Sequence, residues 1–211
     1  VIDVKSAQPF LMSLVFLHHH LIKLVDEFKP LLPVIQKYKY EPSIRLFYND
    51  CTSGKFYEQL MIISGLSKPE LKDLLFKHVF YASLYPYKNH IEIGTERWKT
   101  QQLFCSKYRG VFDLLQELKR TVKSTLPLVD ELTKSYTVPN ILAQRLESKI
   151  FLDGITCQCA EQDIPVATIH DAWIMKKSDQ NRFMEVFYDE FKLLTVNPPQ
   201  VKITELSATI I

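Results

Sequence analysis

The chain has 211 residues, of which 46% are hydrophobic and 24% are charged, and its net charge is +2. This length allows one generous domain or a core with a large insertion, and the composition excludes a wholly disordered chain. The near-neutral charge does not exclude a nucleic-acid partner, because only the local patch of surface contacts phosphate groups.

No part of the sequence is typical of a membrane span or of a secretory leader. The longest apolar stretch, PFLMSLVFL at residues 9–17, is too short to cross a bilayer. The four cysteines contain no CxxC pair. We therefore expect free thiols in a reducing intracellular compartment, the cytoplasm or an organelle matrix, and no membrane association.

The first part of the chain predicts one short strand followed by helices. VIDVK at residues 1–5 is typical of a strand. A helical pattern begins near Ala7 and is punctuated by Pro30 and Pro33. A second helix is predicted to begin near Lys55.

The clearest helix start is SKPE at residues 67–70, where a serine N-cap, a proline and a glutamate form a capping box. This motif predicts a helix from Lys68 to about Leu84. Two more helices are predicted over residues 94–107 and 110–124.

The last third of the chain predicts a long helix, two paired strands, a helix and a final strand. The long helix begins at Pro139 and reaches about Glu161. The paired strands are joined tightly at His170 and Asp171, inside the apolar run PVATIHDAWIMKK. The predicted ranges are 165–169 and 172–176 for the paired strands, 179–194 for the second helix and 201–208 for the final strand.

These elements predict an α+β fold, in which a small antiparallel sheet carries a large helical insertion. Asp3 and Asp171 are far apart in the sequence but can lie on neighbouring strands of that sheet. Two such carboxylates suit divalent cations, which take oxygen ligands and can flank a phosphate during in-line displacement. The simpler alternative is two polar residues that end their strands.

The helix after the capping box carries a stripe of residues spaced by four, namely Lys68, Lys72, Phe76 and Phe80. The lysines occupy the first two turns, where the helix N-terminus already favours anions. The stripe predicts a clamp for a triphosphate followed by an aromatic surface for a sugar and a base. The alternative is an amphipathic helix with solvated lysines and core phenylalanines.

Asn140 and Gln144 lie one turn apart on the predicted long helix, so both amides project from one face. Amides can donate hydrogen bonds to the minor-groove acceptors that all base pairs share. The pair therefore predicts contact with a nucleic-acid duplex.

In this order, the motifs resemble motifs A, B and C of the family A DNA polymerases and of the related single-subunit phage-type RNA polymerases. The matching segments are DVKSAQP, Lys-x3-Lys-x3-Phe-x3-Phe, Asn-x3-Gln and IHDA. The resemblance implies a palm sheet with a helical fingers insertion. The implied palm comprises residues 1–17 and 131–211, and the implied fingers comprise residues 18–130.

The resemblance also implies a reaction, which is attack of a primer 3′-hydroxyl on a deoxynucleoside triphosphate, directed by a template. It implies that Asp3 and Asp171 hold Mg²⁺ or Mn²⁺ and that Lys72 is the motif B lysine that contacts the triphosphate. The roles implied for the other positions are nucleotide binding for Lys68, Phe76, Phe80 and Gln8, and contact with the primer–template for His170, Asn140 and Gln144.

Several positions depart from the family pattern. Phe80 stands where tyrosine is usual, and Tyr81-Ala82 replaces a Tyr-Gly or similar pair. Lys68 stands where arginine is usual, Ala172 stands where the DNA enzymes have an acid, and Gln8 stands where they use glutamate to exclude ribose. These departures leave open the choice between deoxynucleotides and ribonucleotides. The thumb and exonuclease regions of the family lie upstream, so we expect this chain, which begins at Val1, to be a fragment that lacks them and synthesises poorly alone.

Two other functions are compatible with the sequence. One is a polymerase-derived module that binds nucleic acid or a protein without catalysis. The other is an HD-type phosphohydrolase, which also uses a His-Asp pair with metal but has an all-helical fold. Two further sets, residues 18–20 (three histidines) and Cys157-x-Cys159, have spacings that do not converge on one metal ion.

Overall fold

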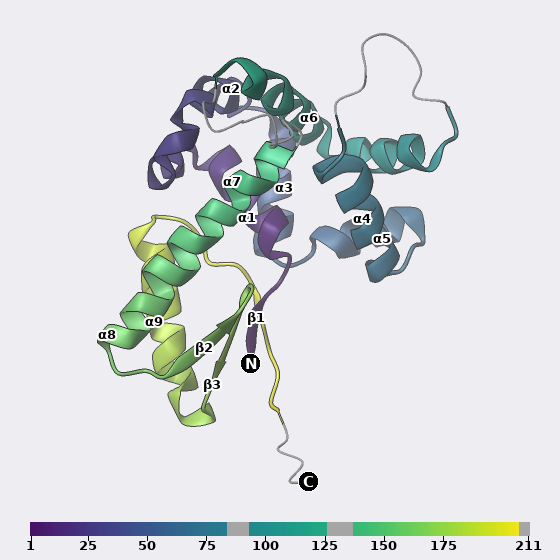
Figure 1. Ribbon diagram of the computed structural model, residues 1–211. Coiled ribbons are helices and arrows are strands. Elements are labelled where there is room, and N and C mark those ends of the chain that lie inside the picture. Colours follow the sequence, from purple (N-terminus) through teal and green to yellow (C-terminus); the bar gives the residue numbers. More distant parts are fainter. Residues whose placement is uncertain (84–92, 126–136, 207–211) are drawn as a thin grey trace.

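The computed structural model describes residues 1–83, 93–125 and 137–206. Most of the described chain is helical, and a small antiparallel sheet lies at one end of the helices (Figure 1). The α+β class predicted from the sequence is therefore confirmed. The predicted boundary between residues 130 and 131 lies outside the described residues.

The strand that opens the chain occupies an inner position in the sheet. The strand order is β2-β3-β1-β4, so β1 is hydrogen bonded to β3 on one side and to β4 on the other. All three pairs are antiparallel. The strands are β1 (Ile2–Val4), β2 (Val166–Ile169), β3 (Ala172–Met175) and β4 (Val201–Ile203).

The alternation of side chains along β1 separates the core from the solvent-facing side. Ile2 and Val4 are 1% and 2% exposed and belong to the hydrophobic core. Asp3 lies between them, so its side chain projects from the opposite face of the strand and is only half-buried. Across the sheet, Asp3 is paired with Ala172 on β3 and with Lys202 on β4.

The β2–β3 hairpin is anchored through Trp173. This indole is 1% exposed and contacts the rings of Phe151, Phe183 and Phe187 at centroid distances of 5.1–6.1 Å. Its Nε1 atom donates a hydrogen bond of 3.0 Å to the Thr156 hydroxyl. The tight turn that follows β2 is therefore attached to a fixed support.

The first helices pack around α1 (Ala7–Leu17), most of whose residues are buried. The predicted helix does not continue unbroken, because the chain forms 3-10 turns at His19–Leu24 and Asp26–Leu31 before α2 (Leu32–Lys37). Helix α3 (Pro42–Thr52) was not predicted separately, although Pro42 occupies its first turn.

Helix α4 (Phe56–Ser64) and helix α5 (Lys68–Leu75) confirm the two predicted helix starts. In the capping box, the Glu70 carboxylate accepts a hydrogen bond of 3.0 Å from the Ser67 backbone N–H. Helix α5 then continues as a π-helical turn at Phe76–Phe80. The helix ends at Phe80, before the predicted end near Leu84, and residues 81–83 are not helical.

The two helices predicted over residues 94–107 and 110–124 form one element, α6 (Glu96–Thr125). The element is kinked at Tyr108, whose φ of −126° and ψ of 45° are not helical. The Tyr108 hydroxyl donates a hydrogen bond of 2.8 Å to Asp50 of α3. The predicted boundary between the two helices therefore coincides with this kink, and the chain forms one bent helix there instead of two separate helices.

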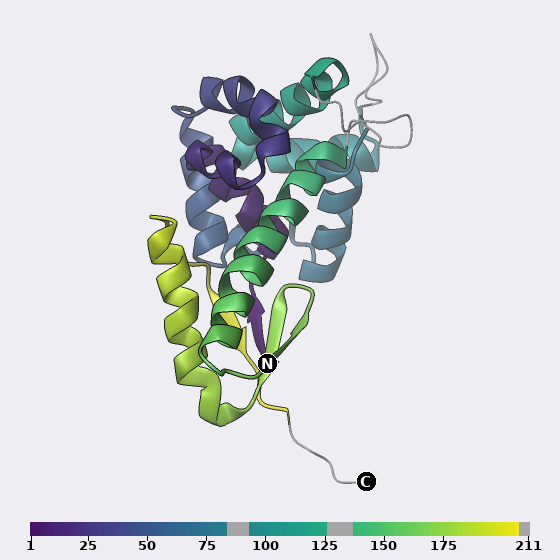
Figure 2. The ribbon, with the colours of Figure 1, turned by 60° about the vertical axis from the view of Figure 1, so that its left-hand side comes forward.

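The long helix predicted from Pro139 is also confirmed, with an internal change of hydrogen bonding. It comprises α7 (Val138–Glu147), a π-helical segment (Ser148–Thr156) and α8 (Cys157–Glu161). Helix α9 (Gln180–Leu193) packs beside its lower half (Figure 2). Within the ranges described, no helix is both long enough and apolar enough to cross a membrane.

Candidate functional site

A cleft of about 520 Å³ opens where β1, the β2–β3 turn, α5 and α7 meet. Figure 1 shows α4 and α5 on the opposite side of β1 from the hairpin, so the two walls come from different parts of the chain. Eight residues predicted from the sequence line this cleft, namely Asp3, Gln8, Lys68, Lys72, Phe76, Gln144, His170 and Asp171.

The two predicted metal ligands lie on adjacent segments of the sheet. Asp3 is on β1, and Asp171 immediately precedes β3, where its carbonyl accepts a hydrogen bond of 3.1 Å from the Val4 N–H. Burial raises the pKa of Asp3 above its ordinary value, and repulsion by Asp171 raises it further. Two carboxylates that repel each other in one cleft provide an oxygen-rich site that a cation would stabilise.

His170 occupies a strained position in the turn between β2 and β3. Its φ is 52°, in the left-handed region that favours glycine or asparagine, and the two-residue turn is closed by the Ile169–Ala172 pair. The exposed imidazole therefore reaches the cleft beside Asp171 at the cost of backbone strain. Strained residues of this kind occur preferentially at functional sites.

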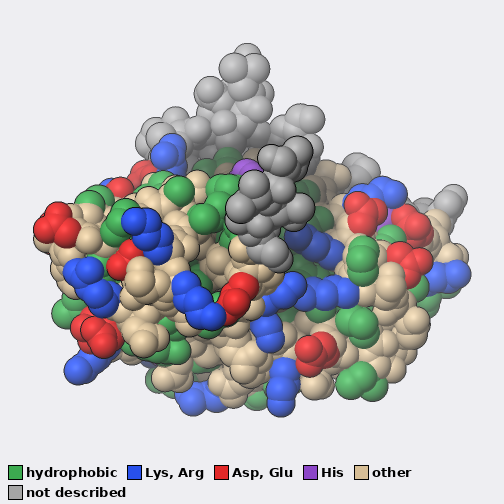
Figure 3. Space-filling view, turned by 90° about the horizontal axis from the view of Figure 1, so that it is seen from below, with side chains coloured by type: hydrophobic (Ala, Val, Ile, Leu, Met, Phe, Trp, Pro, Cys, Tyr) green, Lys and Arg blue, Asp and Glu red, His purple; other side chains and the backbone are tan. Residues whose placement is uncertain are grey.

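Four lysines line the cleft, and their charges oppose those of the carboxylates. Figure 3, which views the sheet end of the molecule, shows Lys and Arg side chains gathered beside a hollow. Attraction to lysines partly offsets the raised pKa of Asp3, with Lys202 contributing most, then Lys68, then Lys72. The four are Lys5, Lys68, Lys72 and Lys202.

Phe76 contributes the aromatic part of the lining. It is half-buried at the first position of the π-helical turn and packs against the rings of Phe80 and Tyr81, at centroid distances of 5.6 and 5.7 Å. The Tyr81 ring is nearly parallel to that of Phe76, with an interplanar angle of 26°. Phe76 therefore gives the cleft one apolar wall, and the rings of Phe80 and Tyr81 hold the Phe76 ring in place.

The other two predicted residues, Phe80 and Asn140, do not line the cleft. Phe80 is 1% exposed and packs against Phe56 and Phe104 in the core. Asn140 is also 1% exposed, and its Nδ2 atom donates a hydrogen bond of 3.1 Å to the Phe80 carbonyl. In this structure both residues support the helix that carries Phe76, and neither faces a ligand.

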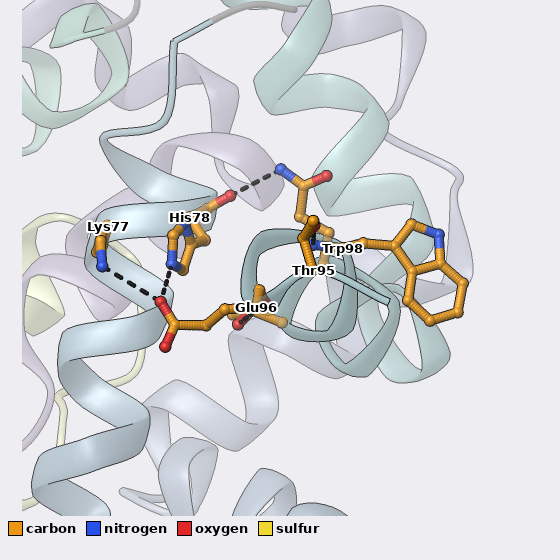
Figure 4. Close-up of polar contacts among 7 residues, drawn as sticks. Lys77, His78, Thr95, Glu96 and Trp98 are labelled. Atoms are coloured by element: carbon orange, nitrogen blue, oxygen red, sulfur yellow. Dashed lines mark hydrogen bonds and ion pairs between the residues drawn. The ribbon is translucent and has the colours of Figure 1, made fainter. Parts of the chain in front are cut away.

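Side chains of α6 hold the far end of the same helix. The Glu96 carboxylate contacts His78 at 2.8 Å and Lys77 at 3.2 Å, and Gln101 donates a hydrogen bond of 2.8 Å to the His78 carbonyl (Figure 4). The fully buried Lys119 donates to the carbonyls of Val79 and Ala82, at 2.8 and 3.0 Å. The carbonyls that a helix end leaves unpaired are satisfied here by side chains.

Eight further cleft residues were not predicted as site residues, and three of them lie outside the N-terminal segment: Glu147, Tyr57 and Lys202. Glu147 follows Gln144 by three residues on α7, so helical spacing could have found it. Burial raises the pKa of Glu147, and the nearby Asp171 raises it further. The other two come from α4 and β4, and no sequence pattern links them to the motifs.

Within the described ranges, no group of three or more His, Cys, Asp or Glu side chains is arranged to hold a metal ion by itself. A cation held by Asp3 and Asp171 would therefore need water or substrate oxygens to complete its coordination. The three histidines at residues 18–20 form no such group, and all four cysteines are free.

No protein-family model matches this chain, and neither a curated protein nor a solved structure is significantly similar to it.

Proposed function

We propose that this chain forms the palm and fingers of a template-directed nucleotidyltransferase, in the simplest case a DNA polymerase. The observation that supports this function is the composition of one cleft. Segments from both ends and from the middle of the chain contribute three carboxylates, four lysines, two aromatic rings and two amides to it. Phosphoryl transfer depends mainly on positioning and charge stabilisation, and these groups supply both.

In the proposed reaction, Asp3 and Asp171 hold Mg²⁺ or Mn²⁺. When bound, such ions lower the pKa of an attacking hydroxyl and stabilise the charge of a leaving pyrophosphate. Lys68 and Lys72 neutralise the phosphates through charge-assisted hydrogen bonds. This assignment uses only side chains that line one cleft.

The remaining lining residues suit the nonreacting parts of the substrates. In the proposed complex, Phe76 packs against the sugar of the incoming nucleotide. Gln8, in the first turn of α1, selects between sugars. Gln144 and His170 lie on the α7 and hairpin side of the cleft and contact the primer–template. Template pairing, rather than protein contact with base edges, supplies the sequence specificity.

Of the two alternatives, an HD-type hydrolase receives no support from the geometry. His170 and Asp171 lie in the turn of a β-hairpin, whereas that class holds its metal between helices. A module that binds nucleic acid without catalysis uses the same basic cleft, so only an activity measurement separates it from a polymerase.

The test is incorporation of a single nucleotide by the purified chain on a labelled primer–template, with Mg²⁺ or Mn²⁺ and with deoxynucleotides or ribonucleotides. We expect templated extension by one nucleotide, and we expect Lys72→Ala to raise the KM for the nucleotide. The matched control is Lys99→Ala, an exposed lysine of α6 outside the cleft lining. Tight primer–template binding without incorporation under any of these conditions would reject the polymerase and support the noncatalytic binding module.

A further inference from the structure

Tyr57 lines the cleft although only 3% of its surface is exposed. It lies in the first turn of α4, and the neighbouring Phe56 ring packs against it at a centroid distance of 4.8 Å. The phenol is therefore fixed by the core, while its accessible part faces the cleft. A ring held in this way loses little conformational entropy when it binds a ligand.

The Tyr57 ring also lies beside the first lysine of α5. The Nζ atom of Lys68 is 5.5 Å from the centroid of the Tyr57 ring, within the range of a cation–π interaction. Among the described residues, no carboxylate lies within ion-pair distance of Lys68. The ring therefore orients the ammonium group without neutralising it, and the positive charge stays available to an anion.

The Tyr57 hydroxyl has no hydrogen-bond partner among the described residues. The hydroxyl of a buried tyrosine usually finds one. Burial raises the pKa of Tyr57 above its ordinary value, so the group keeps its proton and remains a donor. Among the described residues, the Tyr57 hydroxyl lacks a hydrogen-bond partner and the Lys68 ammonium group lacks an ion-pair partner, and both residues line the same cleft.

The sequence suggested that the N-terminus of α5 attracts an anionic ligand, but in the structure a carboxylate of the chain itself already occupies this position. The Glu70 carboxylate occupies it, accepting hydrogen bonds from the backbone N–H and the hydroxyl of Ser67. The local negative charge weakens the attraction of the helix N-terminus for a phosphate. Side-chain donors are therefore needed at this end of α5.

We propose that the Tyr57 hydroxyl and the Lys68 ammonium group together bind a phosphate of the triphosphate substrate, with the Tyr57 ring positioning Lys68. This inference rests on the proposed nucleotidyl transfer for its substrate, but its ligand chemistry, a polyphosphate anion, can be tested without any catalysis. It makes Tyr57 a nucleotide-binding residue that none of the four sequence motifs contains.

The test is calorimetric titration of the protein with inorganic tripolyphosphate, in parallel with the KM for the nucleotide in the incorporation assay. Tyr57→Phe removes only the hydroxyl, and we expect about a tenfold loss of affinity, as for a hydrogen bond to a charged group. Tyr57→Leu also removes the ring, so we expect this variant to lose more affinity for tripolyphosphate than Tyr57→Phe does. In a double-mutant cycle, the variant that carries both Tyr57→Leu and Lys68→Ala should lose less binding free energy than the sum of the losses of the two single variants.

The matched control is Tyr48→Phe, because Tyr48 is 4% exposed but its hydroxyl accepts a hydrogen bond from the Asn197 N–H, away from the cleft. We expect this variant to bind tripolyphosphate as the wild type does. Equal affinities for the wild type and Tyr57→Phe would overturn the inference, as would a loss explained by a lower melting temperature. Loss of tripolyphosphate binding in Tyr57→Phe, in a protein that never incorporates nucleotides, would support the inference and reject the polymerase.

Discussion

Asn140 and Gln144 are one turn apart on α7, yet Gln144 lines the cleft while Asn140 is buried and donates a hydrogen bond of 3.1 Å to the Phe80 carbonyl. The two amides that were predicted to act together thus have separate roles. Gln144 is exposed to the cleft, and Asn140 fixes the helix that carries Phe76.

This separation predicts different effects for two alanine variants. Asn140→Ala leaves the Phe80 carbonyl unpaired in the core, so we expect a loss of about 1 kcal/mol in the free energy of unfolding. Gln144→Ala removes an exposed amide, so we expect unchanged stability and about a fivefold weaker affinity for a primer–template duplex. Urea unfolding and fluorescence anisotropy measure the two quantities. An Asn140→Ala protein that is as stable as the wild type but binds the duplex weakly would instead support the sequence-based prediction that Asn140 contacts the duplex.

A second prediction concerns the cation. Asp3→Asn and Asp171→Asn should each reduce incorporation by at least about 100-fold, because each removes part of the charge that stabilises the transition state. In thermal unfolding, Mg²⁺ should raise the melting temperature of the wild type, because a ligand of the native state stabilises it. Neither variant should respond. Asp189→Asn, which changes an exposed carboxylate on α9, is the control and should respond as the wild type does.

Asp3→Asn also predicts how the thermal stability of the protein depends on pH. The pKa of Asp3 is higher in the folded protein than its ordinary value of 3.8, so the charged carboxylate destabilises the fold at neutral pH. Without metal, Asp3→Asn should therefore unfold at a higher temperature than the wild type at pH 7, and the difference should disappear below pH 3.8. A difference that persists in acid would show that the carboxyl group acts on stability by another route.

The third prediction concerns His170, whose φ of 52° costs backbone energy. His170→Asn places a residue that tolerates the left-handed region at this turn, so we expect stability to be kept or raised by up to about 1 kcal/mol. Incorporation should fall because the imidazole is lost from the cleft. His170→Val, with a β-branched side chain, should instead lower the melting temperature. Full activity of the asparagine variant would show that only the turn requires His170.

A fourth prediction tests the anchor at the end of the Phe76 helix. Burial, followed by the charge of Arg97, lowers the pKa of Lys119 to about 7. The unfolded chain then binds more protons than the folded protein above pH 7, so wild-type stability should increase with rising pH. The neutral amine still has two donors for the carbonyls of Val79 and Ala82.

Lys119→Met removes both donors and leaves the two carbonyls unpaired, so we expect it to be less stable at pH 9 by about 2 kcal/mol. The stability gap between wild type and variant should widen from pH 7 to pH 9, by at most about 1.4 kcal/mol per pH unit. Urea unfolding at the two pH values measures the gap. A gap that narrows with pH would mean that the ammonium form stabilises this anchor.

Local signals were sufficient to predict most of the elements. The capping box at Ser67 begins α5 as expected, and the period-two runs around Asp3 and on both sides of His170 form strands. These signals depend on neighbouring residues only. Helix α3 was not separated from the preceding helical pattern, because its start is marked only by Pro42, one of several prolines in that region.

The positions of Phe80 and Asn140 depended on nonlocal packing. Four residues advance an α-helix by slightly more than one turn, so a stripe of this spacing rotates by about 40° per step and by about 120° from Lys68 to Phe80. The π-helical turn changes the rotation again at Phe76. Phe80 therefore faces the core, and only the position of α6 decides which face is covered.

Strand β1 is hydrogen bonded to β3 and β4, both of which come from the last 40 residues of the sequence. The contacts of β1 are therefore among the most distant in sequence that the chain can make, and such contacts form slowly. The helices can collapse early, whereas β1 can pair only after the segments that form β3 and β4 have been synthesised. Asp3 and Asp171 thus come together only when β1 pairs with β3, so the proposed cation site cannot form before that step.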